Sequence, residues 1–339
     1  MADTSTHREQ VAPAEAGPAP VGRARTWSPW RLDADWLRRN GVYVALLLLL
    51  LVNVVLTDNF LSWGTLRLQL VQVAPVVIVA LGMTLVIGTG GIDLSVGAVM
   101  ALAAALIPLY VGYGTVPAVL IGLVAGLATG LLAGVLVAHV GVQPIVATLG
   151  IMVAGRGVAN LFGGEIKSIR DPGIVALGSG SVLGVPYVVL IGLVAALLVW
   201  VVVRVSTYGR QLLAIGGNPM AARLAGLPVR RVLVTTYVVS GLLAAVAGVL
   251  LAARSQASDP TRLGLLMELS AITAVVIGGT PLTGGQVRVA GTVAGALLVQ
   301  LITATLIFHD IPDSTAQLAQ AVIVVGAVYV QLGRRKGRR

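Results

Sequence analysis

The sequence predicts an all-α membrane protein, a polytopic bundle of about ten transmembrane helices. Of its 339 residues, 57% are hydrophobic and only 11% are charged, and the mean hydropathy is +0.95. Soluble domains carry about a quarter charged residues because their hydrated surface needs them. A very large soluble core is no alternative, because a chain of this size must still cover itself with polar side chains. Most of the surface is therefore expected to face lipid.

Apolar runs between polar or Gly/Pro breaks locate the spans. A helix needs roughly 20 apolar residues to cross the hydrocarbon layer. The runs lie at 42–57, 70–88, 94–112, 116–138, 144–162, 186–203, 232–252, 268–279, 289–308 and 315–332. The eighth run is short and the junction of the second and third is rich in glycine, so counts of eight to ten remain open.

The segment before the first span, 1–40, is rich in Ala, Pro and Arg and is predicted to be a disordered basic arm. The run from Val42 lacks a small-residue cleavage pattern soon after it, so we expect it to stay as a membrane helix. Residues 41–333 then form the transmembrane domain, with a large loop at 204–231. Residues 334–339 form a basic tail.

Basic residues predict the orientation. With the N-terminus inside and ten spans, 17 of the 23 Lys and Arg residues fall in inner segments and five in outer loops. This asymmetry predicts that both termini are cytoplasmic, and it favours an even number of spans. The net charge of +10 gathers in the arm, the large loop and the tail, and aromatic residues make up only 4%. No stacking platform for nucleic acid is therefore expected.

Glycines mark two features of the spans. Gly122, Gly126, Gly130 and Gly134 form a ladder on one face of the fourth span, where a neighbouring helix can approach closely, either as static packing or as a sliding surface. A weak internal echo joins residues 86–91 to 276–285, each a Val-Ile-Gly leading through a Gly-Gly pair toward a helix of small residues. Duplicated halves are common in transporters, but this match is too short to establish one.

The large loop contains a short helix with both ends capped. Asn218 suits the N-cap, Pro219 suits the first helical position, and Gly226 suits the left-handed position after the end. An isolated helix of about two turns is marginal in water. It must therefore pack against its own bundle, as an ordered connector, or against a second protein.

The chain has no motor or catalytic site of its own. A phosphate-binding loop needs glycines and a lysine, and neither Lys167 nor Lys336 follows a Gly-x-x-x-x-Gly. The histidines are scattered and there is no cysteine. We expect no catalytic, cofactor or metal site, and ATP hydrolysis, if it occurs, in a partner.

Two ionisable residues in or beside spans are candidates for the substrate pathway, because such groups are costly in lipid. Arg156 lies in the outer half of the fifth span, where it would donate hydrogen bonds to a sugar, anchor a carbonyl or reach the outer surface. Asp93 follows a glycine break; it either lines a polar cavity or, helped by Ser95, caps the third span. Pairing of Asp93 with Arg156 would require a re-entrant loop. The predicted pathway is completed by Gln143, Thr148 and Asn160.

Several separated motifs resemble those of one family. They are GIDLSVG at 91–97, QPIVATLG at 143–150, the capped loop helix, and the runs at 82–87 and 152–157. In this order they resemble the permease subunits of bacterial sugar ABC importers, of the ribose, xylose and galactofuranose type. The resemblance runs from about Ala74 to Val330.

The resemblance implies a helix bundle of the vitamin-B12-importer type in the bacterial plasma (inner) membrane. It implies a homo- or heterodimer of permeases with two ABC ATPase subunits, which bind ATP and Mg, and a soluble sugar-binding protein. The loop helix would be the coupling helix that the ATPase grips. Its coupling residues would be Asn218, Pro219, Ala221, Ala222, Arg223 and Gly226. The Glu-Ala-Ala pattern of many ABC permeases is absent, since residues 213–216 read LAIG.

Two alternatives stay open from the sequence. An ion-coupled secondary transporter would need carboxylates in its spans, and the chain offers chiefly Asp93 and Glu268. An ABC permease for another solute, such as a branched-chain amino acid, would share the same general plan.

Overall fold

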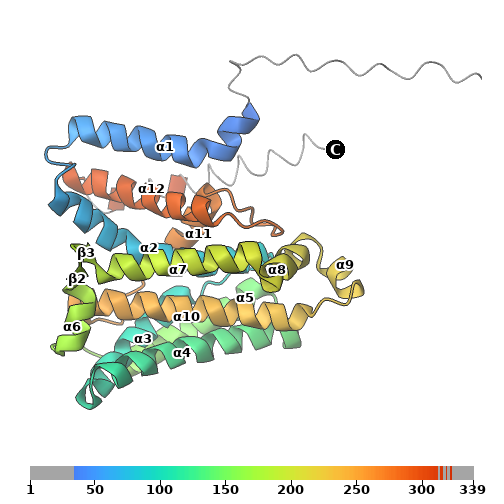
Figure 1. Cartoon of the computed structure of the whole chain (residues 1–339). Coiled ribbons are helices and arrows are strands. Elements are labelled where there is room, and N and C mark those ends of the chain that lie inside the picture. The colour runs from blue at the N-terminus through green and yellow to red at the C-terminus, as the bar shows by residue number, and fades with distance from the viewer. Residues whose placement is uncertain (1–33, 312–313, 316–317, 319–320, 323–339) are drawn as a thin grey trace, which may run out of the picture.

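The computed structural model describes residues 34–311, 314–315, 318 and 321–322 and shows a bundle of helices (Figure 1). Within this described part, seven helices are long and apolar enough to cross a membrane, which confirms the all-α polytopic prediction. They are α2 (Trp63–Gly88), α3 (Val96–Tyr110) with η1 (Val111–Tyr113), α4 (Thr115–Val135) with the π-helical η2 (Leu136–Val140), α5 (Pro144–Gly163), α7 (Tyr187–Val205), α10 (Val229–Ser255) and α12 (Val289–Phe308).

Five further helices and two strand pairs complete the described fold. They are α1 (Ala34–Leu56), α6 (Pro172–Ser179), α8 (Thr207–Gly217), α9 (Pro219–Leu224) and α11 (Met267–Ile277), with β1 (Lys167–Ser168) antiparallel to β4 (Ala257–Ser258) and β2 (Ser181–Val182) antiparallel to β3 (Val185–Pro186). Helix α1 begins inside the range predicted for the basic arm. Residues 1–33, the tail and most of the predicted span at 315–332 lie outside the described residues.

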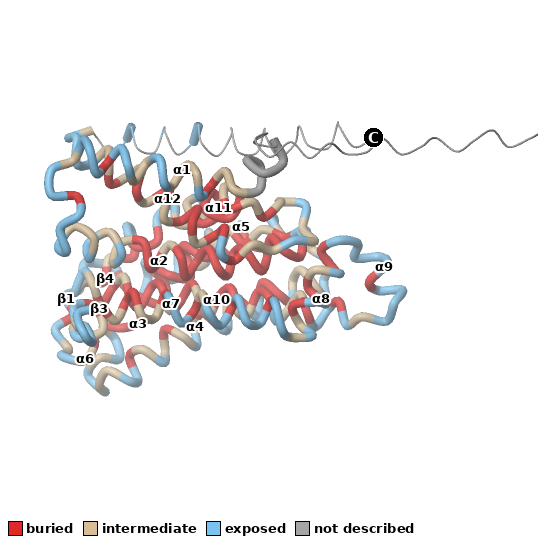
Figure 2. The backbone as a smooth tube through the Cα atoms, turned by 45° about the horizontal axis from the view of Figure 1, so that its top comes forward, coloured by how far each residue is buried: buried red, intermediate tan, exposed pale blue. Residues whose placement is uncertain are grey.

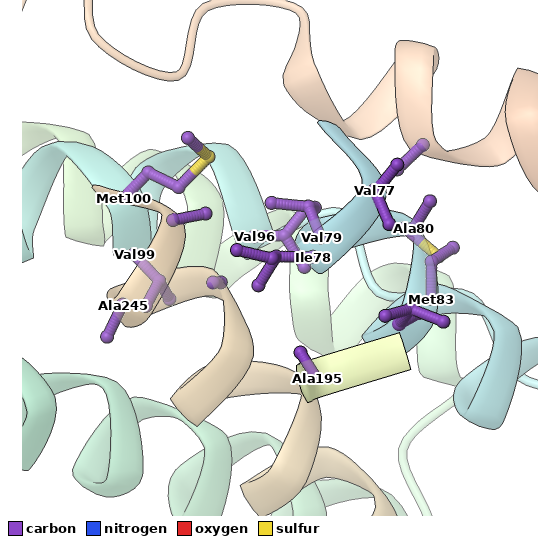
Figure 3. Packing of buried hydrophobic residues seen from close by; sticks show 14 of the residues in the cluster. Val77, Ile78, Val79, Ala80, Met83, Val96, Val99, Met100, Ala195 and Ala245 are labelled. Carbon is purple, nitrogen blue, oxygen red and sulfur yellow. The ribbon is translucent and has the colours of Figure 1, made fainter. Parts of the chain in front are cut away.

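Helix α2 forms the centre of the bundle. Nearly every residue from Val73 to Gly88 is buried, because α2 packs against α7, α10, α11 and α12. A helix that is apolar on all sides is stable when other helices enclose it. Figure 2 shows the buried backbone concentrated along α2 and its neighbours. Figure 3 shows the core itself, to which α2 contributes Ile78 and Met83, α3 contributes Val99 and α7 contributes Ala195.

Two short helices begin in the middle of the bundle. After α2 ends at Gly88, the chain turns back, and α3 begins only beside the midpoint of α10, where Asp93 bonds Ser240. Helix α11 has 11 residues, about 16 Å, which is half of a bilayer core. A Cβ on Gly97 would contact the Glu268 carboxylate, so the first turns of α3 and α11 adjoin. The two helices then run to opposite ends of the bundle.

Hydropathy alone predicted both short helices as ordinary spans at 94–112 and 268–279. The run at 94–112 is confirmed as a candidate span, Val96–Tyr113, which follows the irregular residues 89–95. The run at 268–279 corresponds to the shorter helix α11, which follows the irregular residues 259–266. Irregular backbone at such depth is tolerated where protein surrounds it.

Three backbone segments meet through glycines at the end of the bundle that carries α8. The Gly285 amide donates to the Gly88 carbonyl at 3.0 Å, which joins the two glycine-rich stretches of the internal echo. A Cβ built on Gly216 of α8 would overlap the Gly88 carbonyl oxygen and lie 2.6 Å from the Gly285 nitrogen. Helix α8 therefore sits directly on the backbone of both breaks, and no side chain fits at position 216.

We expect Gly216→Ala to lower the thermal unfolding temperature of the detergent-solubilised protein by several degrees. The methyl group must push α8 away from Gly88, and overpacking of this kind costs about 1–3 kcal/mol. Gly217→Ala is the matched control, since a Cβ there meets nothing within 4 Å. Equal unfolding temperatures for the two variants would contradict the assigned junction.

The predicted glycine ladder packs as expected against neighbouring backbone. A Cβ on Gly130 would lie 2.5 Å from the Tyr237 carbonyl oxygen, and one on Gly134 would lie 2.8 Å from the Val234 Cα, both on α10.

Hydrogen bonds between polar side chains join other pairs of helices. Thr84 and Thr292 share a 2.7 Å hydrogen bond, and Gln300 donates to Gln72 at 2.7 Å. These hydroxyl and amide groups therefore hold helices together in this structure.

Candidate substrate pathway and coupling site

Asp93 is buried in the middle of the bundle, with 1% of its surface exposed. Its Oδ1 accepts hydrogen bonds from the Ser95 amide at 3.0 Å and the Ser95 hydroxyl at 2.6 Å. Its Oδ2 accepts one at 2.8 Å from the Ser240 hydroxyl of α10. Three donors compensate the loss of water around the carboxylate. Asp93 therefore links the residues that lead into α3 to the middle of α10.

The sequence left two roles open for Asp93, lining a polar cavity or capping the third span, and this geometry matches neither of them fully. Its partner is the amide of Ser95, the residue before α3 begins, so Asp93 braces the approach to the helix instead of capping its first turn. A cavity-lining role is not visible, because the side chain is enclosed by protein.

The backbone before Asp93 is shaped by a tight turn. Gly90 adopts a left-handed φ of +83°, which glycine reaches at little cost. The Gly91 amide donates to the Val86 carbonyl at 3.1 Å. The buried Thr148 hydroxyl lies between the Pro144 carbonyl of its own helix, at 2.9 Å, and the Ile92 carbonyl, at 3.2 Å. The break between α2 and α3 is thus held by α2 on one side and by α5 on the other.

Arg156 anchors a second irregular segment. Its Nη1 donates to the carbonyls of Pro260 at 3.1 Å and Leu263 at 2.7 Å, in the stretch that precedes α11. Its guanidinium also interacts electrostatically with Glu268 in the first turn of α11. Carbonyl anchoring, one of the sequence alternatives, is therefore what Arg156 does in this state. Asp93 and Arg156 belong to two neighbouring clusters, on either side of Gly97, and are not brought together as a pair.

The other predicted pathway residues are split between the core and the surface of α5. Ser95 and Thr148 are buried in the Asp93 cluster. Gln143 and Asn160 lie at the two ends of α5 and are exposed. Small residues also lie on the exposed part of α5, and a Cβ on Gly150 or Gly157 would meet nothing within 4 Å. Among the described residues, no group of three His, Cys, Asp or Glu could hold a metal ion.

The loop at 204–231 contains two helices where one was predicted. Helix α8 is amphipathic and buries Leu212 and Ile215 against the bundle. Helix α9 has the predicted caps: the Asn218 side chain accepts from the Ala221 amide at 3.0 Å, and Gly226 has a φ of +78°. The Leu227 amide returns to the Ala222 carbonyl at 3.0 Å, which closes the last turn.

Helix α9 projects from one end of the bundle, at the right of Figure 1. Ala222 is 6% exposed and faces the protein itself, so it seats α9 on its support. Asn218, Pro219, Ala221, Arg223 and Gly226 are exposed. Met220 and Leu224 are 65% and 83% exposed. Sequence reasoning missed these two residues because it weighed their helix propensity and not the direction of their side chains.

The opposite end of the bundle is stabilised by two half-buried carboxylates, Asp171 and Asp259. Asp171 caps α6 and accepts from the Thr115 hydroxyl at 2.6 Å and the Ile174 amide at 2.9 Å. The hydrogen bond from Thr115 lowers the pKa of Asp171 below its usual value. The Asp259 carboxylate accepts from the Thr261 hydroxyl, which likewise lowers the pKa of Asp259. Both carboxylates therefore stay ionised at neutral pH and fix the turns that they cap.

The chain is similar in sequence to known transport proteins over most of its length. A family model described as "Branched-chain amino acid transport system / permease component" matches residues 66–328. The galactofuranose transporter permease protein YtfT of Escherichia coli (strain K12) is 43% identical over 303 residues, covering 86% of this chain and 89% of that protein. The ribose import permease protein RbsC of Bacillus subtilis (strain 168) is 35% identical, covering 88% of this chain and 94% of that protein.

A third relative is the fructose import permease protein FruF of Bifidobacterium longum (strain NCC 2705). It is 36% identical over 301 residues, covering 83% of this chain and 84% of that protein. No solved structure matches the chain significantly. The resemblance inferred from the separated motifs is confirmed.

Proposed function

This chain belongs to the permease-component family of ABC importers, and from that premise we propose that it translocates a monosaccharide across the bacterial plasma membrane. Energy would come from a separate ATPase subunit, and a soluble binding protein would deliver the sugar. The observation that carries the proposal is the capped helix α9, which displays Met220 and Leu224 at the end of a bundle rich in apolar helices. The chain itself is a transport subunit and not an enzyme.

Sugar is favoured as the substrate over an amino acid. The family description names branched-chain amino acids, but the relatives that cover most of this chain are named for galactofuranose, ribose and fructose. An ion-coupled mechanism has less support. The buried carboxylate of Asp93 accepts from three protein donors, and the carboxylate of Glu268 is attracted by the Arg156 guanidinium.

The orientation supported by this function places α8 and α9 in the cytoplasm, where an ATPase can reach them. Arg204, Arg210, Arg223, Arg230 and Arg231 lie in or beside these helices, as expected for a cytoplasmic loop. This proposal places the basic arm and the basic tail on the same, cytoplasmic side of the membrane. The vitamin-B12-importer-type arrangement with ten spans is part of this proposal.

The pathway is proposed to pass the point where α3 and α11 begin, next to the exposed face of α5. Broken helices near the membrane midplane commonly form transporter binding sites. Arg156 is only half-buried and can change partners from the Leu263 carbonyl to a sugar hydroxyl. A second permease copy against α5 would enclose Asn160 and Gln143, which face outward in the single chain.

Reconstitution tests this function directly. Proteoliposomes should contain this chain together with the ATPase and the binding protein from the same organism. They should accumulate one labelled pentose or hexose when ATP is supplied on the side of the membrane where the ATPase is bound. Omitting the ATPase should abolish accumulation. Accumulation by the chain alone, driven by a proton or sodium gradient, would refute the proposal in favour of secondary transport.

A further inference from the structure

We propose that Ser240 and Tyr237 of α10 are alternative hydrogen-bond donors to Asp93, and that the carboxylate passes from one to the other during the transport cycle. The inference rests on the proposed function, because it requires α9 to be moved by an ATPase. All three are positioning residues, which act on the break between α2 and α3 and need not touch the sugar.

The first observation is an unused polar group in the core. Tyr237 is fully buried, yet its hydroxyl has no hydrogen-bond partner among the described residues. Buried hydroxyl groups nearly always have a partner, because leaving one unpaired is costly. A phenylalanine would fill the same space without that cost. The hydroxyl therefore calls for a role in another state of the protein.

The second observation is the position of that hydroxyl. A Cβ on Gly91 would lie 2.5 Å from the Tyr237 hydroxyl oxygen, so the hydroxyl lies against the backbone two residues before Asp93. The Asp93 carboxylate also acts electrostatically on Tyr237. A strong acceptor close to Tyr237 is thus the Asp93 carboxylate, whose Oδ2 now accepts from Ser240.

The third observation is the spacing along α10. Residues three apart lie on the same helix face and differ by about 4.5 Å along the axis. A shift of α10 by this distance, toward the end that carries α6, would carry Tyr237 to the level that Ser240 now holds. The Thr148 hydroxyl of α5 also lies 3.2 Å from the Ile92 carbonyl, so the break has a contact that does not depend on α10.

Helix α9 is placed to drive such a shift. Only residues 225–228 separate α9 from α10, so a displacement of α9 acts on the start of α10 with little slack. Before and after the shift, the buried Asp93 carboxylate accepts a hydrogen bond from α10. At intermediate positions of α10 the carboxylate has no donor from this helix, which is unfavourable. Two favourable positions separated by an unfavourable one make a two-state element.

The full complex in proteoliposomes tests the exchange. Tyr237→Phe should lower ATP-driven uptake by roughly tenfold or more, the worth of one hydrogen bond to a charged group. ATP hydrolysis stimulated by the binding protein should continue, so that more ATP is hydrolysed for each sugar imported. The thermal unfolding temperature should equal or exceed that of the wild type, because the hydroxyl is unpaired in this state.

Ser240→Ala should lower uptake as Tyr237→Phe does, but it should also lower the unfolding temperature. The reason is that the hydrogen bond from Ser240 to Asp93 is present in this state. Thr273→Val is the matched control, because this buried hydroxyl bonds only the Leu269 carbonyl of its own helix, and its uptake should stay within roughly twofold of the wild type.

Two results would overturn the exchange. One is wild-type uptake by Tyr237→Phe. The other is a lowered unfolding temperature for that variant, which would show that the hydroxyl already has a partner in this state. Failure of the wild-type complex to import sugar with ATP would instead refute the proposed function, so the two failures are distinguishable.

Discussion

Replacing Leu224 with glutamate should abolish ATP-driven uptake while leaving the chain folded in the membrane. Leu224 is 83% exposed on the projecting helix α9, beside Met220 at 65%. Apolar side chains displayed together on a protruding helix are typical of a docking site for a partner. Truncating a central interface residue costs about 2–4 kcal/mol, and a buried unpaired carboxylate adds to this cost. The affinity for the ATPase should therefore fall by at least about 30-fold.

The measurement is co-purification of the ATPase with a tagged permease, followed by uptake in proteoliposomes. Leu224→Met keeps an apolar side chain and should retain both activities. Leu183→Glu is a second control, because Leu183 is 98% exposed at the tip of the β2–β3 hairpin, at the other end of the bundle, and should keep the ATPase bound. Retention of the ATPase by Leu224→Glu would refute the docking assignment.

The part of this site that could be predicted from sequence is the part that is local. The caps of α9 depend on Asn218, Pro219 and Gly226, which act within nine residues of one another, and their chemistry is readable from the chain. The spans follow from hydropathy for the same reason. Which face of α9 is exposed depends on α8 and α10 beneath it, and so Ala222 was predicted as a contact residue although it is buried.

The depth at which a helix begins could not be predicted. Hydropathy measures the length of an apolar run, and it does not show the depth in the bundle at which the helices of the runs at 94–112 and 268–279 begin. In the structure residues 89–95 are largely buried irregular backbone, and residues 259–266 are irregular backbone that is partly exposed. Their hydrogen bonds go to groups far away in sequence, such as Ser240 for Asp93 and Thr148 for Ile92.

The partner of Arg156 is the clearest long-range feature. Its carbonyl acceptors lie 104 and 107 residues later in the chain, and Glu268 follows them. No local pattern around Arg156 indicates these partners. The sequence showed only that an arginine in a span needs polar partners. The structure shows that these partners are carbonyl groups in the stretch before α11.

Arg156→Leu should therefore destabilise the protein more than an ordinary core substitution. The change removes two hydrogen bonds to the segment before α11 and leaves the Glu268 carboxylate, whose Oε2 is buried, without its positive neighbour. Removing one member of a buried charge pair costs about 3–5 kcal/mol, and the lower end applies because Arg156 is only half-buried. The thermal unfolding temperature in detergent should fall accordingly. Arg156→Lys keeps the charge but not the two-carbonyl geometry and should lie between Arg156→Leu and the wild type.

The decisive comparison is the double variant Arg156→Leu with Glu268→Gln. If the main cost is an uncompensated carboxylate, neutralising Glu268 should restore a large part of the lost stability, although each single change is unfavourable. If the main role of Arg156 is to hold the Pro260 and Leu263 carbonyls, the double variant should be no more stable than Arg156→Leu. Because α11 begins beside α3 in the middle of the bundle, this result also shows whether charge or backbone anchoring fixes the point where the two short helices meet.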